Sequence, residues 1–127
     1  MIRWIGGVIE VDPGLVKIAE FAEKSRGAYN GRAWKETGRI RLVLGSSKWF
    51  PAPSRIYPGR KSEAYRDPKY RNRTDALVGI TAHEMMHLDP VRGRGERWTT
   101  WAEHAVMARY LPERDRLLKE WRDNSAR

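Results

Sequence analysis

The spacing of apolar residues along the chain predicts alternating strands and helices in its first half. Residues 2–11, IRWIGGVIEV, place β-branched and aromatic residues around a pair of glycines and predict a short strand with a bulge. Residues 12–24 predict a helix, with Asp12 as its N-cap and Pro13 as its first helical residue. Residues 39–45, RIRLVLG, alternate apolar and polar positions and predict a strand.

The second half predicts a long loop followed by three helices. Residues 46–73 are rich in Pro, Gly, Ser and Arg, with one short strand expected near SRIY at 54–57. Helices are expected over 74–88, over 96–111 and from Pro112 onward, the last packing through Leu117, Leu118 and Trp121. The predicted fold is one α+β domain over 1–127, with a short mixed sheet packed on helices.

Composition limits the possible chemistry and location. The 127 residues include no cysteine, so disulfides and thiolate metal ligands are excluded and any metal must be held by nitrogen and oxygen. The N-terminus does not resemble a signal peptide, and no run of about 18 apolar residues could cross a bilayer. We expect a soluble cytoplasmic protein that does not bind membranes.

The charge is strongly positive and unevenly distributed. The net charge is +9, and residues 55–73 carry seven basic side chains mixed with Tyr57, Tyr65 and Tyr70. A mixture of basic and aromatic residues is typical of surfaces that bind single-stranded nucleic acid or an acidic protein. Simple solubility explains the same charge equally well.

The stretch ITAHEMMHL at 80–88 carries the clearest chemical pattern. His83 and His87 are four residues apart, so a helix places both imidazoles on one face, where they can share a zinc ion. Glu84 lies about 100° around the helix from His83. It is thus kept off the metal but beside a water molecule that the metal polarises, as a general base requires.

A catalytic zinc usually has a third protein ligand, which we expect from the next helix. Glu103 is the leading candidate, because a carboxylate among apolar neighbours needs a cation or another partner. His104 and Glu96 are alternatives, and Glu103 could instead pair with an arginine. Tyr110 shares the helix face of Glu103 two turns on and is the candidate to stabilise the oxyanion, with His104 or a loop tyrosine as alternatives.

The residues His83, Glu84 and His87, followed by Glu103 within TTWAEHAVMARY, resemble the zincin metalloproteases of the gluzincin branch over residues 74–111. The resemblance implies a zinc-dependent peptidase acting on a peptide or protein substrate. His83, His87 and Glu103 would hold Zn²⁺, and Glu84 would be the base. The alternative is a non-catalytic module, with or without metal, that binds nucleic acid or an acidic partner through residues 55–73.

Overall fold

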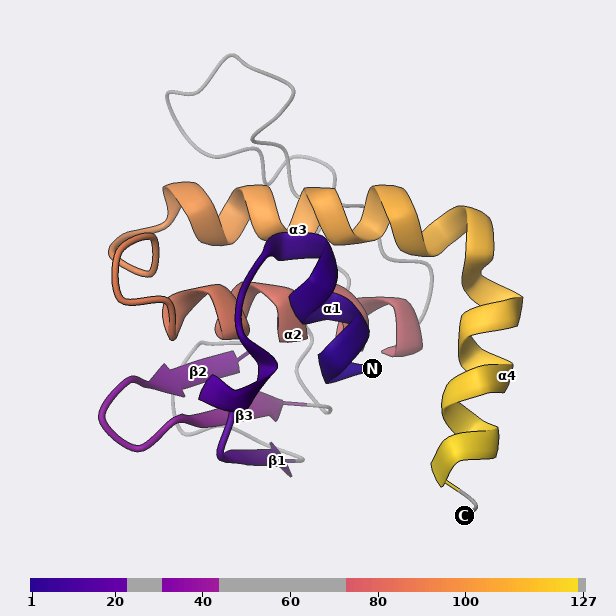
Figure 1. Cartoon of the computed structure of the whole chain (residues 1–127), viewed down its shortest axis with the longest axis horizontal. Helices are drawn as coiled ribbons and strands as arrows, with labels where there is room; N and C mark the ends of the chain where they lie inside the picture. Colours follow the sequence, from indigo (N-terminus) through magenta and orange to yellow (C-terminus); the bar gives the residue numbers. More distant parts are fainter. Residues whose placement is uncertain (23–30, 44–72, 126–127) are drawn as a thin grey trace.

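The computed structural model describes residues 1–22, 31–43 and 73–125 (Figure 1). The described elements are α1 (Ile2–Ile9), the 3₁₀ turn η1 (Pro13–Leu15), β1 (Ile18–Ala22), β2 (Gly31–Trp34), β3 (Arg39–Val43), α2 (Arg73–His87), α3 (Arg97–Tyr110), the 3₁₀ turn η4 (Leu111–Glu113) and α4 (Arg114–Ser125). The prediction of an α+β chain with a mixed sheet is confirmed.

The prediction of a strand over 2–11 was wrong, because this stretch forms α1. Ile5 and Ile9 are four residues apart, and both are completely buried against the other helices. That separation puts them on one helical face, whereas a strand would need alternation. The helix ends at Glu10, which adopts a left-handed conformation with φ of 57°.

The prediction of a helix over 12–24 was also wrong over the described residues 12–22. Asp12 does cap, but it caps only the 3₁₀ turn η1, accepting a hydrogen bond from the Gly14 amide at 2.8 Å. The chain then extends into β1, which pairs with β3 along its whole length. Pairing with a distant strand therefore outweighs the local helical spacing, as is common for short segments.

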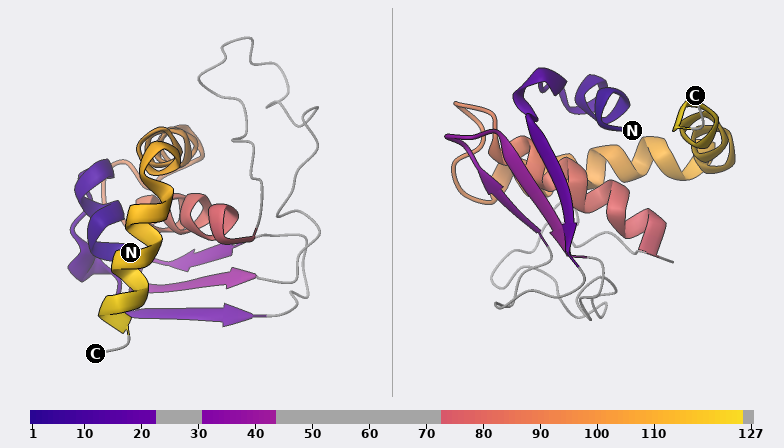
Figure 2. Two further views of the ribbon diagram at one scale, coloured as in Figure 1. Left: turned by 90° about the vertical axis from the view of Figure 1, so that its right-hand side faces the viewer. Right: turned by 90° about the horizontal axis from the view of Figure 1, so that it is seen from below.

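The sheet has the strand order β1–β3–β2, with β1 parallel and β2 antiparallel to β3. The strand predicted at 39–45 is confirmed as β3, and Ile40 and Leu42 are its buried residues. No strand was predicted over the residues of β2. Helix α2 contacts β2 and β3, and Figure 2 shows the helices gathered on one side of the three strands.

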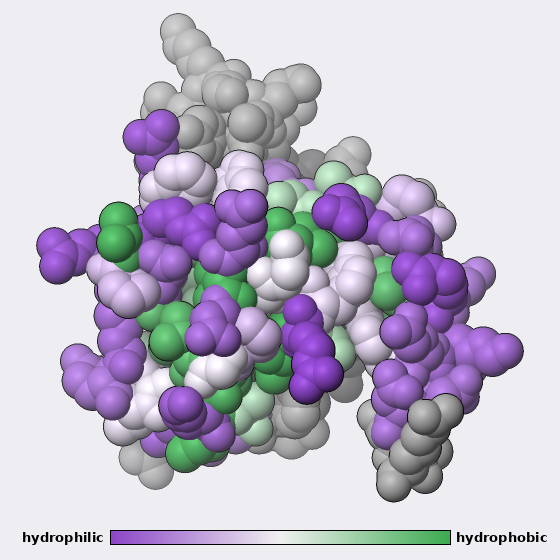
Figure 3. Space-filling view, in the orientation of Figure 1, coloured by the Kyte–Doolittle hydropathy of each residue, from purple (hydrophilic) through white to green (hydrophobic). Residues whose placement is uncertain are grey.

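The three predicted C-terminal helices are confirmed as α2, α3 and α4. Helices α2 and α3 pack side by side (Figure 1) and supply most of the core, including Met85, Met86 and Val106. Leu117 of α4 is buried, and Trp121 stacks on Tyr110 with ring centroids 6.2 Å apart. The outward surface of α4 is mostly hydrophilic (Figure 3).

None of the helices in the described ranges is both long enough and apolar enough to cross a membrane. The strand expected near 54–57 and the basic segment 55–72 lie outside the described residues.

Candidate metal centre

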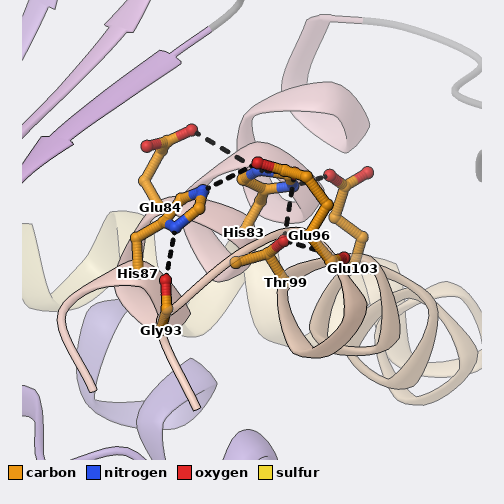
Figure 4. A network of polar contacts seen from close by, with 7 residues as sticks. All are labelled: His83, Glu84, His87, Gly93, Glu96, Thr99 and Glu103. Atoms are coloured by element: carbon orange, nitrogen blue, oxygen red, sulfur yellow. Dashed lines mark hydrogen bonds and ion pairs between the residues drawn. The ribbon is translucent and has the colours of Figure 1, made fainter. Parts of the chain in front are cut away.

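The candidate site is formed where α2 ends, the chain turns, and α3 begins (Figure 4). His83, Glu84 and His87 come from the last turns of α2, and their ligand atoms lie within 4.8 Å of one another. Glu96 precedes the first residue of α3, and Glu103 lies two turns further on. The side chains of His83, His87, Glu96 and Glu103 meet between the two helices, and Glu84 lies beside them on the side facing the sheet.

The turn between α2 and α3 is held in place by Asp89 and Arg92. The Asp89 carboxylate accepts hydrogen bonds from the amides of Val91 and Arg92 at 2.9 and 2.8 Å. The Arg92 guanidinium donates to the carbonyl oxygens of Ile9 and Glu10, at 3.2 and 2.7 Å. The turn is therefore anchored to the end of α1, which directs the chain back toward the histidines.

Gly93 is the point at which this turn touches His87. Its carbonyl oxygen lies 3.0 Å from Nδ1 of His87 and accepts the hydrogen bond from that nitrogen. A Cβ atom at position 93 would lie 2.4 Å from the carbonyl oxygen of His87, so only glycine fits there. The contact leaves Nε2 of His87 facing the interior of the site.

His83 is held in the same way by a different partner. Its Nδ1 forms a short hydrogen bond with the carboxylate of Glu103, which is 5% exposed. Its Nε2 faces Glu96, with Oε2 of that residue 3.2 Å away. Both imidazoles thus use Nδ1 for support and direct Nε2 toward the same place, as metal-binding histidines usually do.

Glu96 bridges the two histidines. One carboxylate oxygen lies 3.2 Å from Nε2 of His83, and the other lies 3.4 Å from Nε2 of His87. The Thr99 hydroxyl lies 3.2 Å from Oε2 of Glu96 and 3.1 Å from its carbonyl oxygen, so it can steady the carboxylate. Although the Glu96 side chain is 58% exposed, its tip is directed inward (Figure 4).

These contacts shift the protonation of all three groups. Burial alone would lower the pKa of His83, but the carboxylates of Glu103 and Glu96 outweigh it and raise that pKa well above its usual range. The hydrogen bond to Glu96 raises the pKa of His87. The two histidines in turn hold the pKa of Glu96 well below its usual range. Glu96 thus favours the charged form of both imidazoles and is their shared counter-ion.

Glu84 is different because it is buried. Burial raises the pKa of its carboxyl to about 7, against the opposing influence of the two histidines. Its Oε1 lies 3.9 Å from Nε2 of His83, on the side facing β2. A Cβ atom on Gly31 would lie 2.9 Å from Cγ of Glu84, so the start of β2 lies directly against this side chain. A carboxyl whose pKa lies near neutrality can both accept and return a proton.

The donor set fits a small divalent metal ion. Nitrogen and oxygen ligands about 2.0–2.1 Å from a tetrahedral zinc lie roughly 3.3–3.4 Å from one another. Glu96 approaches this spacing with two different oxygens, Oε2 at 3.2 Å from Nε2 of His83 and Oε1 at 3.4 Å from Nε2 of His87. The ligand atoms of His83, Glu84 and His87 lie within 4.8 Å of one another, so these three side chains could also hold an ion. Two imidazoles and one carboxylate are also a ligand set that zinc accepts readily.

The structure brings together most, but not all, of the side chains expected at the site. Glu103 is near, but it contacts Nδ1 of His83 and not the Nε2 atoms that converge. His104, the next residue on α3, is half-buried. Tyr110 is not brought to the histidines: it is completely buried, and its hydroxyl donates to Asp75 at 3.0 Å, in the first turn of α2.

Gly93, Thr99 and Gly31 belong to the site but were not predicted from the sequence. The signal for Gly93 was present in the glycines of RGRG, which favour a tight turn back toward the helix. Thr99, three residues after Glu96, was visible only as a neighbour on the same helical face. No local signal links Gly31 to Glu84, because their contact depends on how the sheet packs against α2.

Comparison of the chain with models of known protein families, with curated proteins and with solved structures finds no match. Its function must therefore be inferred from the chemistry of the site.

Proposed function

We propose that this protein is a zinc-dependent peptidase whose metal is held between α2 and α3. The observation that carries the proposal is the shared orientation of His83 and His87. Each uses Nδ1 for a supporting hydrogen bond and directs Nε2 toward the Glu96 carboxylate. The resemblance of residues 74–111 to gluzincin metalloproteases supports the same function.

Glu96 is the third ligand in this proposal, in place of Glu103. Its two oxygens lie at ligand-like separations from the two Nε2 atoms, whereas Glu103 lies on the opposite edge of the His83 ring. Glu103 is then a positioning residue that fixes the His83 ring and strengthens it as a donor. Such outer partners typically change metal affinity by about 10- to 100-fold.

Zinc bound there would polarise the substrate carbonyl and increase the acidity of a water molecule. Glu84 takes the proton as the water oxygen bonds to the carbonyl carbon. It then delivers that proton to the amide nitrogen as the carbon–nitrogen bond breaks. Its burial beside Gly31 keeps the carboxyl away from bulk solvent.

β2 is the proposed platform for the substrate. In the described part of the sheet it is an edge strand, and its first residue, Gly31, contacts Glu84. A peptide that pairs with this edge by backbone hydrogen bonds would run past the base.

The test is hydrolysis by the zinc-loaded protein, measured with a broad peptide library. Glu84→Gln keeps the size of the side chain but removes its basicity, so it should retain one zinc and lose about 10²- to 10⁴-fold in rate. Undiminished cleavage by this variant would show that another group is the base. Failure of the loaded wild-type protein to cleave any peptide would reject the peptidase proposal.

The identity of the third ligand is tested by zinc affinity. Glu96→Gln and Glu103→Gln are matched, since both replace a carboxylate that contacts His83 with an amide of the same size. We expect Glu96→Gln to weaken zinc binding more than Glu103→Gln, and His104→Ala to leave it nearly unchanged. The reverse order for the two glutamates would restore Glu103 as the ligand.

A metal-free interaction module is the second candidate, and one observation favours it. Glu96 and Glu103 already neutralise both histidines, so the site is fully paired without an ion. A protein purified without chelators that contains no zinc, and takes up none when zinc is added, would support this candidate over the peptidase.

A further inference from the structure

The face of the sheet that points away from the helices carries a cluster of arginines around one tryptophan. Strand alternation and register place eight residues on this face, and six of them form two rows that cross all three strands. One row is Glu20, Arg41 and Arg32, and the other is Ile18, Arg39 and Trp34. We call these six residues the arginine face; the opposite face of β3 carries Ile40 and Leu42 and is buried.

The three guanidinium groups surround Trp34. Their central carbons lie 4.6 Å (Arg39), 5.1 Å (Arg32) and 5.5 Å (Arg41) from the centroid of the indole ring. Arg32 and Arg41 are also directly opposite each other in the register of β2 and β3. Like charges in such a pair destabilise a sheet, and the cation–π contacts with Trp34 oppose that cost.

Glu20 balances one of these charges. Its carboxylate accepts hydrogen bonds from Arg39 and Arg41, the latter at 3.1 Å. Burial alone would raise the pKa of Glu20, but the two arginines outweigh it and lower that pKa, so Glu20 is ionised at neutral pH. The arginine face therefore carries two positive charges in excess. Lys17 and Lys35, both exposed, flank it at the ends of β1 and β2.

We propose that the arginine face binds single-stranded nucleic acid. Its excess positive charge fits a phosphate backbone, and Arg39, Arg41 and Glu20 each keep about a third of their side-chain surface exposed. Trp34, partly exposed among the arginines, offers an aromatic surface on which a base can stack. An acidic protein would match the charge but would make no use of the ring. This surface is separate from the histidine site, because Gly31, which contacts Glu84, points to the opposite face of the sheet.

Fluorescence anisotropy with a labelled single-stranded oligonucleotide tests the proposal in the full-length protein. The double variant Arg32→Ala Arg41→Ala should weaken binding by about tenfold or more and flatten the dependence of affinity on salt concentration. The matched control, Lys119→Ala Arg122→Ala, removes two exposed charges from α4, at the other end of the molecule (Figure 1), and should change affinity by less than about twofold. Trp34→Leu should also weaken binding, because stacking is lost.

Glu20→Gln provides a test in the opposite direction. It removes the negative charge from the arginine face, so binding should become tighter, and a merely misfolded protein would not show this. Equal losses in the sheet and α4 double variants would overturn the proposal in favour of non-specific attraction to a basic protein. Unlabelled poly-glutamate competing as well as the unlabelled oligonucleotide would overturn it in favour of an acidic protein partner.

Discussion

Among single residues, Glu84 owes its buried environment to a distant part of the chain. It follows His83 on α2, but its side chain is enclosed by the start of β2, where Gly31 leaves no room for another atom. A Cβ at position 31 would also lie 3.0 Å from Cγ2 of Ile80 and 3.1 Å from the carbonyl oxygen of Arg41. A shift of β2 at Gly31 would therefore displace the Glu84 side chain.

Replacing Gly31 with alanine should consequently affect both stability and chemistry. We expect Gly31→Ala to lower the free energy of unfolding by about 1–3 kcal/mol, as overpacking does, and to reduce hydrolysis by displacing Glu84. The measurements are denaturant unfolding and the rate of peptide cleavage by the zinc-loaded protein.

Gly7→Ala is the control for this substitution. Gly7 lies on the exposed side of α1, and a Cβ there meets no atom within 4 Å. Alanine in the interior of a helix should stabilise the protein by about 0.5–1 kcal/mol and leave hydrolysis unchanged. If Gly31→Ala and Gly7→Ala changed stability and hydrolysis equally, the contact between Gly31 and Glu84 would not be important for function.

Among the elements, α2, α3 and α4 are joined by a buried polar contact at the end remote from the histidines. Asp75, which is completely buried in the first turn of α2, accepts a hydrogen bond from Tyr110 and forms an ion pair with Arg114 of α4. Burial, reinforced by the Asp75 charge, raises the pKa of Tyr110 to about 12. Tyr110 is therefore neutral and acts as a donor that ties α3 to α2.

Tyr110→Phe distinguishes this structural role from the catalytic one expected from the sequence. Loss of a buried hydrogen bond to a charged acceptor should destabilise the protein by about 1.5–3 kcal/mol. The turnover of peptide by the folded variant should be unchanged. Calorimetry and steady-state kinetics measure the two effects. A large fall in turnover without destabilisation would instead indicate that Tyr110 takes part in catalysis.

The elements that the sequence predicted correctly are those whose local pattern agrees with their packing. In β3 the alternating residues face a buried and an open side of the sheet, and in α2 the apolar residues repeat at helical spacing. The predictions for residues 2–11 and 12–24 were wrong. The second segment includes β1, which forms a strand because it pairs with β3. β2 is four residues long and follows a turn-rich stretch, so its local signal was weak.

The same limit applies to the site. His83, Glu84 and His87 lie within one helical turn, so a local pattern was enough to group them. Glu96 and Glu103 are seven residues apart and share one helix face, so spacing could not rank them. Their different positions relative to the His83 ring follow from the path of residues 88–96, which is set by long-range contacts of Arg92 with the end of α1.

For the whole molecule, the paired charges at the site make stability depend on pH. His83 and His87 have pKa values raised above 6.5 in the folded protein. The stability that they contribute is complete below about 6.5 and is lost as pH rises through the raised values. Glu84, shifted from 4.5 to about 7, acts in the same direction between those values. The metal-free protein should therefore become less stable as pH rises above 4.5, through about 7 and on through the raised histidine values.

Thermal unfolding of the metal-free protein across this pH range measures the effect. In the His83→Ala His87→Ala variant the decline should be much smaller, since the main titrating groups are gone. Zinc should reverse the trend in the wild-type protein, because the metal must displace the Nε2 protons and binds more tightly as pH rises. A melting temperature of the metal-free protein that rises with pH would contradict the proposed charge state of the site.

The proposed peptidase depends on one divalent ion being held by His83 and His87. Calorimetric titration of zinc into the metal-free protein near neutral pH, beside the His83→Ala His87→Ala variant, tests this most directly. We predict one zinc per chain for the wild-type protein, with release of protons, and no measurable binding by the variant. Equal stoichiometry and affinity in the two proteins would contradict the account.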